Sequence, residues 1–547
     1  MIRWFIALCV LAAPLCAQSS ADIRAGFGML AKAHPKQIEL LNLPGSDTAY
    51  AAVLRDQNVT GDLPAVLVLG SLHGDETAPA AACLELATRV LEDAEAVKLL
   101  SAHELIIIPN ANPEARDLRY AKLSNAVPGV LLPHDDDRDG RTDEDGPSDI
   151  NGDGVISQMR VKRAGGKYRV SKLDPRILIE AKPGEEGEYD LYWEGQDDDG
   201  DGRINEDAVG TVTLGNDWSI RWSDEQPGAN RFMMQLKQTR ALADFITPRR
   251  NIVAAIQLRS IGDGIEFAKG PKAQREDPYE RDKQMQASIE KLLGEKALPG
   301  AVKAEPEGAG NVLDWLYESQ GVYAANLYLA SVSGPKKEQK EDGEEEKKEE
   351  PKKPAREKPD EAELAQQAWL AYAPGDYLEW KSFKHPQLGE VEIGGWKITA
   401  RHDPSEEDAK AGAGKAFTFV KSLIGALPKL EVSKVEVEDK GSGLYRVRLT
   451  LHNAGALDYK TAFSTRNRIH MPLFVSVSDT KAVELVSATR RQETENLQAD
   501  GTTTFEWLVR ASDKGAELDF TVESDRCGKL NHKVAVKDCP AIKTEDE

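Results

Sequence analysis

An alternation of strand and helix patterns constrains the fold of this chain more than any other feature. The apolar run at 65–70 (AVLVLG) predicts a buried strand, 79–100 has helical spacing, and 103–113 predicts a second buried strand that ends in a polar loop. Strand–helix–strand units place parallel strands side by side in a sheet covered by helices. We therefore expect an α/β fold with a mixed sheet flanked by helices.

The same kind of pattern resumes further along the chain. Helix or strand spacing is found at 230–246, 251–258, 281–294, 321–330 and about 405–426. With 547 residues the chain is too long for one compact domain. We expect the α/β domain to occupy residues 18–428 and to carry two insertions.

The two insertions differ in composition. Residues 131–210 are acidic and rich in glycine, whereas 335–361 contain almost no apolar side chains. A segment without apolar residues cannot bury enough surface to fold, so we expect 335–361 to be a disordered or partly helical spacer.

The character of the sequence changes after Pro428. Seven short segments of alternating polar and apolar residues follow, separated by turn residues. This spacing is typical of a small β-sandwich, which we predict for residues 429–547.

The N-terminus and the overall charge indicate where the chain acts. Arg3 followed by an apolar stretch too short to span a bilayer predicts a signal peptide over 1–17, and thus a secreted or periplasmic protein without a transmembrane segment. The formal charge of −22 argues against nucleic-acid binding. Cys527 and Cys539 could pair in an oxidising compartment, and Cys83 is expected to be buried.

Three acidic loops repeat the pattern of alternating carboxylates followed by glycine, which suits calcium. The candidate ligands are Asp135, Asp137, Asp139, Asp143, Asp149, Asn151, Asp153, Asp197, Asp199 and Asp201. None of the loops ends in the glutamate of a complete EF-hand, so we expect structural calcium sites. The alternative is an acidic insertion that binds no ion.

A histidine and a glutamate follow the first strand with metal-ligand spacing. His73 and Glu76 stand at the carboxyl end of 65–70, where open α/β sheets place their ligands. Imidazole nitrogen and carboxylate oxygen both suit zinc. Alone, this spacing is also common in ordinary polar loops.

The chain resembles the zinc carboxypeptidases, the carboxypeptidase A/B-like metallopeptidases, especially large secreted bacterial members. The resemblance covers about 40–430. It rests on HGDE (73–76), NANPEAR (110–116), TRALADFI (239–246), NVLDWLYESQGVYAANLYL (311–329) and HPQLGEVEIGGW (385–396). It implies a zinc held by two histidines and a glutamate, a glutamate as general base, and an Asn-Arg pair that grips the substrate carboxylate.

The sequence departs from that family pattern at three places. Arg259 stands where the third ligand is expected, and a guanidinium offers no lone pair to a metal. Asn326 stands at the position matched to the general base. In the segment matched to the clamp, only Arg221 could grip a carboxylate, one place from the expected position.

These departures leave three hypotheses open. We favour a non-catalytic carboxypeptidase-like protein that binds a peptide or a cell-surface polymer. The second is an active carboxypeptidase with a rearranged zinc site that recruits Asp263 or Glu266. The third is a calcium-stabilised adhesion or scaffold protein.

Overall fold

A computed structural model describes most of the chain. The described residues are 18–133, 140–143, 145–205, 209–226, 228–271, 279–294, 302, 308–332, 360–478, 482–487, 489–511 and 516–536. The predicted signal peptide, nearly all of the 335–361 spacer, Cys539, and the predicted calcium ligands Asp135, Asp137 and Asp139 lie outside these residues.

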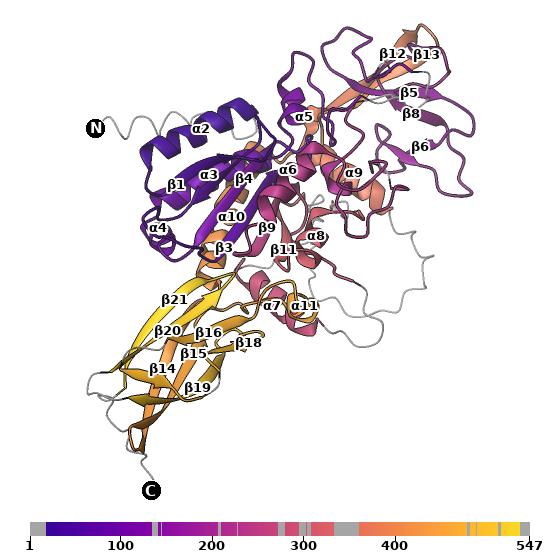
Figure 1. Ribbon diagram of the computed structural model, residues 1–547. Coiled ribbons are helices and arrows are strands. Elements are labelled where there is room, and N and C mark those ends of the chain that lie inside the picture. Colours follow the sequence, from indigo (N-terminus) through magenta and orange to yellow (C-terminus); the bar gives the residue numbers. More distant parts are fainter. Residues whose placement is uncertain are drawn as a thin grey trace, which may run out of the picture.

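The central body is a mixed sheet of seven strands (Figure 1). Its strands, in sheet order, are β1 (Ile38–Asn42), β2 (Tyr50–Leu54), β4 (Glu104–Asn110), β3 (Ala65–Ser71), β9 (Ile252–Ile261), β11 (Tyr323–Ala330) and β10 (Ile265–Phe267). The pairs β4–β3, β3–β9 and β9–β11 are parallel, and the outer pairs are antiparallel. The predicted mixed α/β sheet is confirmed.

Helices cover both faces of this sheet because its strands are apolar on both sides. Buried residues of α2 (Ser20–Ala33), α3 (Ala78–Glu92) and α10 (Glu406–Ala426) form one core with the sheet. Residues of α6 (Lys237–Ile246) and α8 (Val312–Glu318) form a second core on the opposite face.

The remaining helices are short or lie at the edges of the central body. They are α4 (Ala94–Leu99), α5 (Pro113–Asp117), η2 (Leu118–Tyr120), η3 (Leu214–Asn216), α7 (Glu280–Lys291), α9 (Glu361–Tyr372), η4 (Pro374–Asp376) and α11 (Ala462–Asn467). The helix predicted over 79–100 is divided at Asp93, whose side chain accepts from the Ala96 N–H and begins α4. The helix predicted over 230–246 begins only at Lys237.

The acidic insertion contains a sheet that its composition did not predict. Four of its strands, β5 (Ser157–Lys162), β6 (Tyr168–Val170), β7 (Leu178–Glu180) and β8 (Tyr189–Trp193), join the hairpin β12 (Tyr377–His385) and β13 (Gly389–Lys397). Met159 of β5 is buried with Val391 and Ile393 of β13. The insertion therefore folds against a hairpin more than 200 residues later.

The C-terminal region consists of two four-stranded antiparallel sheets, as predicted. One sheet has the order β14 (Leu430–Gly441), β15 (Leu444–Asn453), β19 (Thr502–Ala511) and β17 (Val483–Leu485); the other has β18 (Arg491–Thr494), β16 (Leu473–Ser478), β20 (Glu517–Ser524) and β21 (Gly528–Ala535). Residues of both sheets, among them Val447, Val475 and Phe520, share one core. The seven predicted strands are present, and β18 is added to them.

The C-terminal sheets contact the central body through buried polar groups. Arg526 is fully buried and donates to the backbone oxygens of Ile252 (3.0 Å) and Gly321 (2.6 Å). Asp282 of α7 accepts from the backbone N–H groups of Ala462 and Phe463. These bonds fix the C-terminal sheets to the end of the central sheet where β9 and β11 begin.

Among the described residues, no helix is both long enough and apolar enough to cross a membrane.

Candidate functional site

The site forms where β3 and β9 end side by side. The chain leaves β3 at Ser71, passes through the loop that holds His73 and Glu76, and enters α3 at Ala78. Because β3 and β9 are parallel neighbours, Arg259 and Ser260 reach the same end of the sheet. The structure therefore brings His73, Glu76 and Arg259 into one region, as their positions in the sequence predicted.

Glu76 is held by Arg259 in an ion pair. The Arg259 Nε and Nη2 atoms lie 2.8 Å and 2.7 Å from Oε1 of Glu76. The other carboxylate oxygen, Oε2, accepts from the Ser260 N–H at 3.0 Å. Both side chains are only 12–13% exposed. Both oxygens of Glu76 are thus already in use, and the guanidinium stands beside them where the third ligand was expected.

Asp403 is a central residue of this region that sequence reasoning missed. Its carboxylate accepts from the backbone N–H groups of Thr77 (2.8 Å) and Ala78 (2.9 Å) and from the Thr77 hydroxyl (2.7 Å). Ser260 Oγ donates to it as well, at 3.0 Å. A carboxylate on the first backbone N–H groups of a helix satisfies donors that have no partner within the helix. Asp403 therefore fixes the start of α3 and links it to β9.

His402 and Asp75 form a second ion pair beside the first. His402 Nδ1 lies 3.1 Å from Oδ2 of Asp75. Burial opposes the charge on Asp75, but the hydrogen bond and charge of His402, with the charges of His73 and Arg259, lower the pKa of Asp75 to about 2. Burial likewise opposes protonation of His402, yet the Asp75 carboxylate raises the pKa of His402. The two residues favour each other's charged form.

His73 keeps one ring nitrogen without a partner. Its Nε2 is buried and makes no hydrogen bond. Within the described part of the chain, the one group of three or more His, Cys, Asp or Glu side chains with converging ligand atoms is Asp145, Asp197 and Asp199, which excludes His73 and Glu76. Glu76 is paired to a guanidinium, and no third side chain of the described residues converges on His73 and Glu76, so the residues present do not fit a zinc ion.

The strand β11 places Tyr328 rather than Asn326 level with Arg259. Asn326 pairs in register with Gln257 and is fully buried. Both side chains hydrogen-bond Glu266: the Tyr328 hydroxyl donates at 3.0 Å and the Asn326 amide at 3.5 Å. Neither residue is a carboxylate, so neither can take a proton from water at neutral pH as a glutamate would. Assignment of Asn326 to the base position stays a prediction.

The carboxylates considered as substitute zinc ligands have other partners. Glu266 accepts from Tyr328 and Asn326, as above, and Asp263 accepts from the Ser331 hydroxyl at 2.8 Å. Neither belongs to the converging metal-ligand group of the described residues.

Arg221, the candidate carboxylate clamp, contacts two acidic side chains of α8. It forms ion pairs with Asp314 and Glu318. Burial opposes the charge, but these two carboxylates raise the pKa of Arg221. Its backbone has φ +52°, a conformation that few residues other than glycine adopt. Its role as a clamp stays a prediction.

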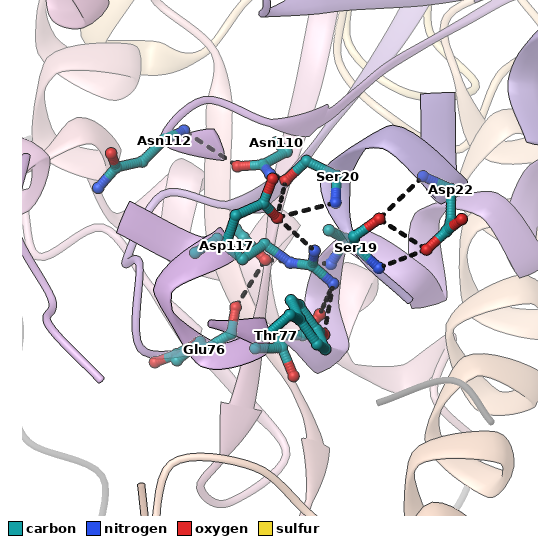
Figure 2. Close-up of polar contacts among 12 residues, drawn as sticks. Ser19, Ser20, Asp22, Glu76, Thr77, Asn110, Asn112 and Asp117 are labelled. Carbon is teal, nitrogen blue, oxygen red and sulfur yellow. Dashed lines mark hydrogen bonds and ion pairs between the residues drawn. The ribbon is translucent and has the colours of Figure 1, made fainter. Parts of the chain in front are cut away.

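The segment 110–116 supports the site through hydrogen bonds to α2 and to the loop before α3 (Figure 2). Arg116 is fully buried, and its Nη2 donates to the Thr77 oxygen at 3.0 Å, which holds the loop before α3. Asn110 Nδ2 donates to the Ser20 hydroxyl at 2.8 Å, and the same hydroxyl donates to Asp117 at 2.7 Å (Figure 2). These bonds connect α2 to the end of β4.

Two of the acidic loops form turns in which one aspartate accepts several backbone hydrogen bonds. In the loop 149–154, the Asp149 carboxylate accepts from the N–H groups of Gly152, Asp153 and Gly154. In the loop 197–202, Asp197 accepts from Gly200 and Gly202 in the same manner. Asp143, Asn151, Asp153, Asp199 and Asp201 also lie within the described residues. Their role as calcium ligands stays a prediction.

Known proteins match this chain in two regions. Residues 36–117 match the family model of zinc carboxypeptidases, and 429–535 match a domain of unknown function (DUF8731). The resemblance to the zinc carboxypeptidases is confirmed. A search among curated proteins finds no match to the chain. The carboxypeptidase match contains His73 and Glu76 but ends long before Arg259.

Solved carboxypeptidases are distant from this chain. Bovine thrombin-activatable fibrinolysis inhibitor is 11% identical with a TM-score of 0.40, and the alignment covers 75% of this chain and 96% of that one. Carboxypeptidase A from Helicoverpa armigera is 14% identical with a TM-score of 0.35, covering 58% and 65% respectively. The likeness to the zinc carboxypeptidases therefore rests on the match over 36–117, and among the described residues no third side chain completes a zinc site with His73 and Glu76.

Proposed function

We propose that this chain is a non-catalytic, carboxypeptidase-like protein that binds peptide at the carboxyl end of its central sheet. The observation that carries the proposal is the ion pair between Arg259 and Glu76. It places a fixed positive charge beside the one carboxylate ligand that the family motif supplies. A guanidinium stays protonated at every physiological pH, so it repels a metal cation.

Loss of catalysis follows from the chemistry of metal-dependent hydrolysis. Such hydrolysis needs a metal that activates water and a general base that takes the proton. In this chain the metal site is incomplete. The neighbouring β11 side chains are an amide and a phenol, both hydrogen-bonded to Glu266.

Binding is supported by what the site retains. His73 Nε2 is a buried hydrogen-bonding atom without a partner, and the charges of Arg259 and His402 lie close enough to the neighbouring Asp75 to lower its pKa. A buried polar atom that lacks a partner costs about 1–3 kcal/mol, and a bound peptide group would relieve that cost.

Peptide binding and hydrolysis are tested together on the purified full chain. We expect a peptide panel to bind in calorimetry and to keep its mass after long incubation with added zinc. His73→Phe should weaken binding about fivefold or more, since the loss of one hydrogen bond is worth about 1 kcal/mol. His532→Phe, on β21 of the C-terminal sheets, is the matched control and should leave binding unchanged. Zinc-dependent release of C-terminal amino acids would contradict the proposal.

The cellular context belongs to the same proposal. We propose export through a signal peptide at 1–17, a carboxypeptidase-like domain at 18–428 and a separate C-terminal domain at 429–547. Supporting features are the apolar N-terminal segment and the change of sequence character after Pro428. Sequencing of the mature N-terminus should begin at Gln18; retention of Met1 would refute processing.

We also propose that the acidic insertion binds structural calcium. The loops around Asp149 and Asp197 support this, because their alternating carboxylates and positive-φ glycines already form compact turns of oxygen-rich side chains.

A further inference from the structure

Asp145 is a buried carboxylate that is not among the calcium ligands predicted from the sequence. It is 1% exposed, although it lies in an insertion whose other acidic side chains are mostly open to solvent. Its Oδ1 accepts from the Asp198 N–H at 2.7 Å. Its Oδ2 is buried and accepts no hydrogen bond. A buried carboxylate oxygen without a donor is costly unless a cation neutralises it.

Two further carboxylates converge on Asp145 from another loop. Asp145, Asp197 and Asp199 each offer a carboxylate oxygen, and these three oxygens lie within 4.8 Å of one another. In the part of the chain that the structure describes, none of these three side chains pairs with a lysine, arginine or histidine. The cluster thus concentrates negative charge around a buried, unpartnered oxygen.

We infer that Asp145, Asp197 and Asp199 bind one calcium ion that joins the two acidic loops. This inference deepens the calcium binding proposed above by naming a ligand from a second loop. Oxygens bound to one calcium at 2.3–2.6 Å can lie up to about 5 Å apart, so three carboxylate oxygens that lie within 4.8 Å of one another can share one calcium ion. Backbone oxygens and water would complete its coordination.

The ion would also fasten the insertion to the hairpin β12–β13. The Asp197 N–H donates to Gln387 Oε1 at 3.1 Å, and His385 Nε2 lies 3.0 Å from the Gly195 oxygen. Both Gln387 and His385 lie at the turn between β12 and β13. Calcium at Asp197 would therefore hold the loop that contacts this turn.

Calcium titration of the full chain, with calorimetry as the readout, tests the site. Asp145→Asn should lower the calcium stoichiometry by one, or weaken one class of site at least about tenfold, because a charged ligand is lost. Asp198→Asn is the matched control. It removes a charge between Asp197 and Asp199 but no ligand of the cluster, and it should retain the calcium stoichiometry. Calcium binding that Asp145→Asn leaves unchanged would overturn this inference alone. No calcium binding at millimolar concentration would overturn both it and the calcium proposal.

Thermal unfolding separates a ligand from a purely structural carboxylate. In EDTA, Asp145→Asn should be at least as stable as the wild type, because it removes a buried charge without a cation. Calcium should raise the melting temperature of the wild type more than that of the variant. An equal loss of stability for Asp145→Asn with and without calcium would overturn the inference.

Discussion

At the scale of single residues, one substitution changes what the carboxyl end of the sheet can do. A metal site needs lone pairs that converge on one point, whereas the Arg259 guanidinium offers only N–H groups that donate hydrogen bonds. Those donors meet Glu76, so the glutamate is satisfied without a metal. Asp75, His402 and Asp403 extend this pairing to the start of α3. The site is held together by side-chain ion pairs and helix capping.

Glu76→Gln should destabilise the protein by about 2–3 kcal/mol, because it leaves the largely buried Arg259 guanidinium without a counter-charge. Urea unfolding measures this change. In an Arg259→Met background, the same substitution should cost less than about 1 kcal/mol, since no guanidinium remains to be paired. An equal loss of unfolding free energy on Glu76→Gln in the wild type and in Arg259→Met would show that Glu76 and Arg259 do not stabilise each other.

The Asp75–His402 pair predicts a dependence of stability on pH. Asp75, whose pKa falls from 3.8 to about 2 on folding, stabilises the fold above about pH 4, and that contribution is lost as pH falls toward 2. His402 has a folded pKa above 6.5, so its contribution is complete below pH 6.5 and is lost as pH rises through the folded pKa. The free energy of unfolding should therefore fall between pH 6 and 9 more steeply in the wild type than in His402→Asn. The same dependence of the free energy of unfolding on pH in the wild type and in His402→Asn would contradict the Asp75–His402 pair.

At the scale of elements, the sequence predicts strands and helices wherever apolar spacing is continuous. The strand at 65–70, the helix at 405–426 and the C-terminal strands all form as expected. The sheet of the insertion was not predicted because β6 and β7 have only three residues each and because β5 pairs with β13, more than 200 residues later. Spacing in the sequence carries no signal for such pairing.

The residues of the candidate site could likewise be predicted only where a local sequence pattern marks them. His73, Glu76 and Arg259 stand at strand ends and inside recognisable segments, so the sequence indicates their proximity. Asp403 contacts Thr77 from 326 positions away, and nothing in the residues around it marks it as a helix cap for α3. Its role depends on the tertiary fold, which brings the segment before α10 to the start of α3.

Close packing of α10 on β11 gives a test at this scale. A methyl group on Gly412 would lie 2.3 Å from the Leu329 oxygen, so Gly412→Ala should destabilise the protein by about 1–3 kcal/mol. Gly425→Ala, in the same helix, meets no atom within 4 Å and should stabilise it by about 0.5 kcal/mol. Thermal or urea unfolding measures both. Similar effects of the two substitutions would contradict the packing of α10.

At the scale of the whole molecule, the central sheet lies between the sheet of the acidic insertion and the two C-terminal sheets (Figure 1). Arg526 joins the C-terminal sheets to the central body, and the hairpin β12–β13 joins the acidic insertion to the segment that carries His402 and Asp403. The carboxypeptidase-like site thus lies where the central sheet and the end of this hairpin meet. Its residues are positioned by the whole fold, whereas the fit of a metal ion depends on a few side chains.

The zinc content of the purified chain tests most directly whether the Arg259–Glu76 ion pair stands in place of a bound zinc ion. After equilibration with zinc and removal of the free metal, elemental analysis should find far less than about one zinc per chain in the wild type. Arg259→His, which removes the competing charge and supplies a third ligand, should raise the zinc content toward about one. A wild-type chain that holds one zinc, and loses it on His73→Ala, would contradict the conclusion that the ion pair has replaced the metal.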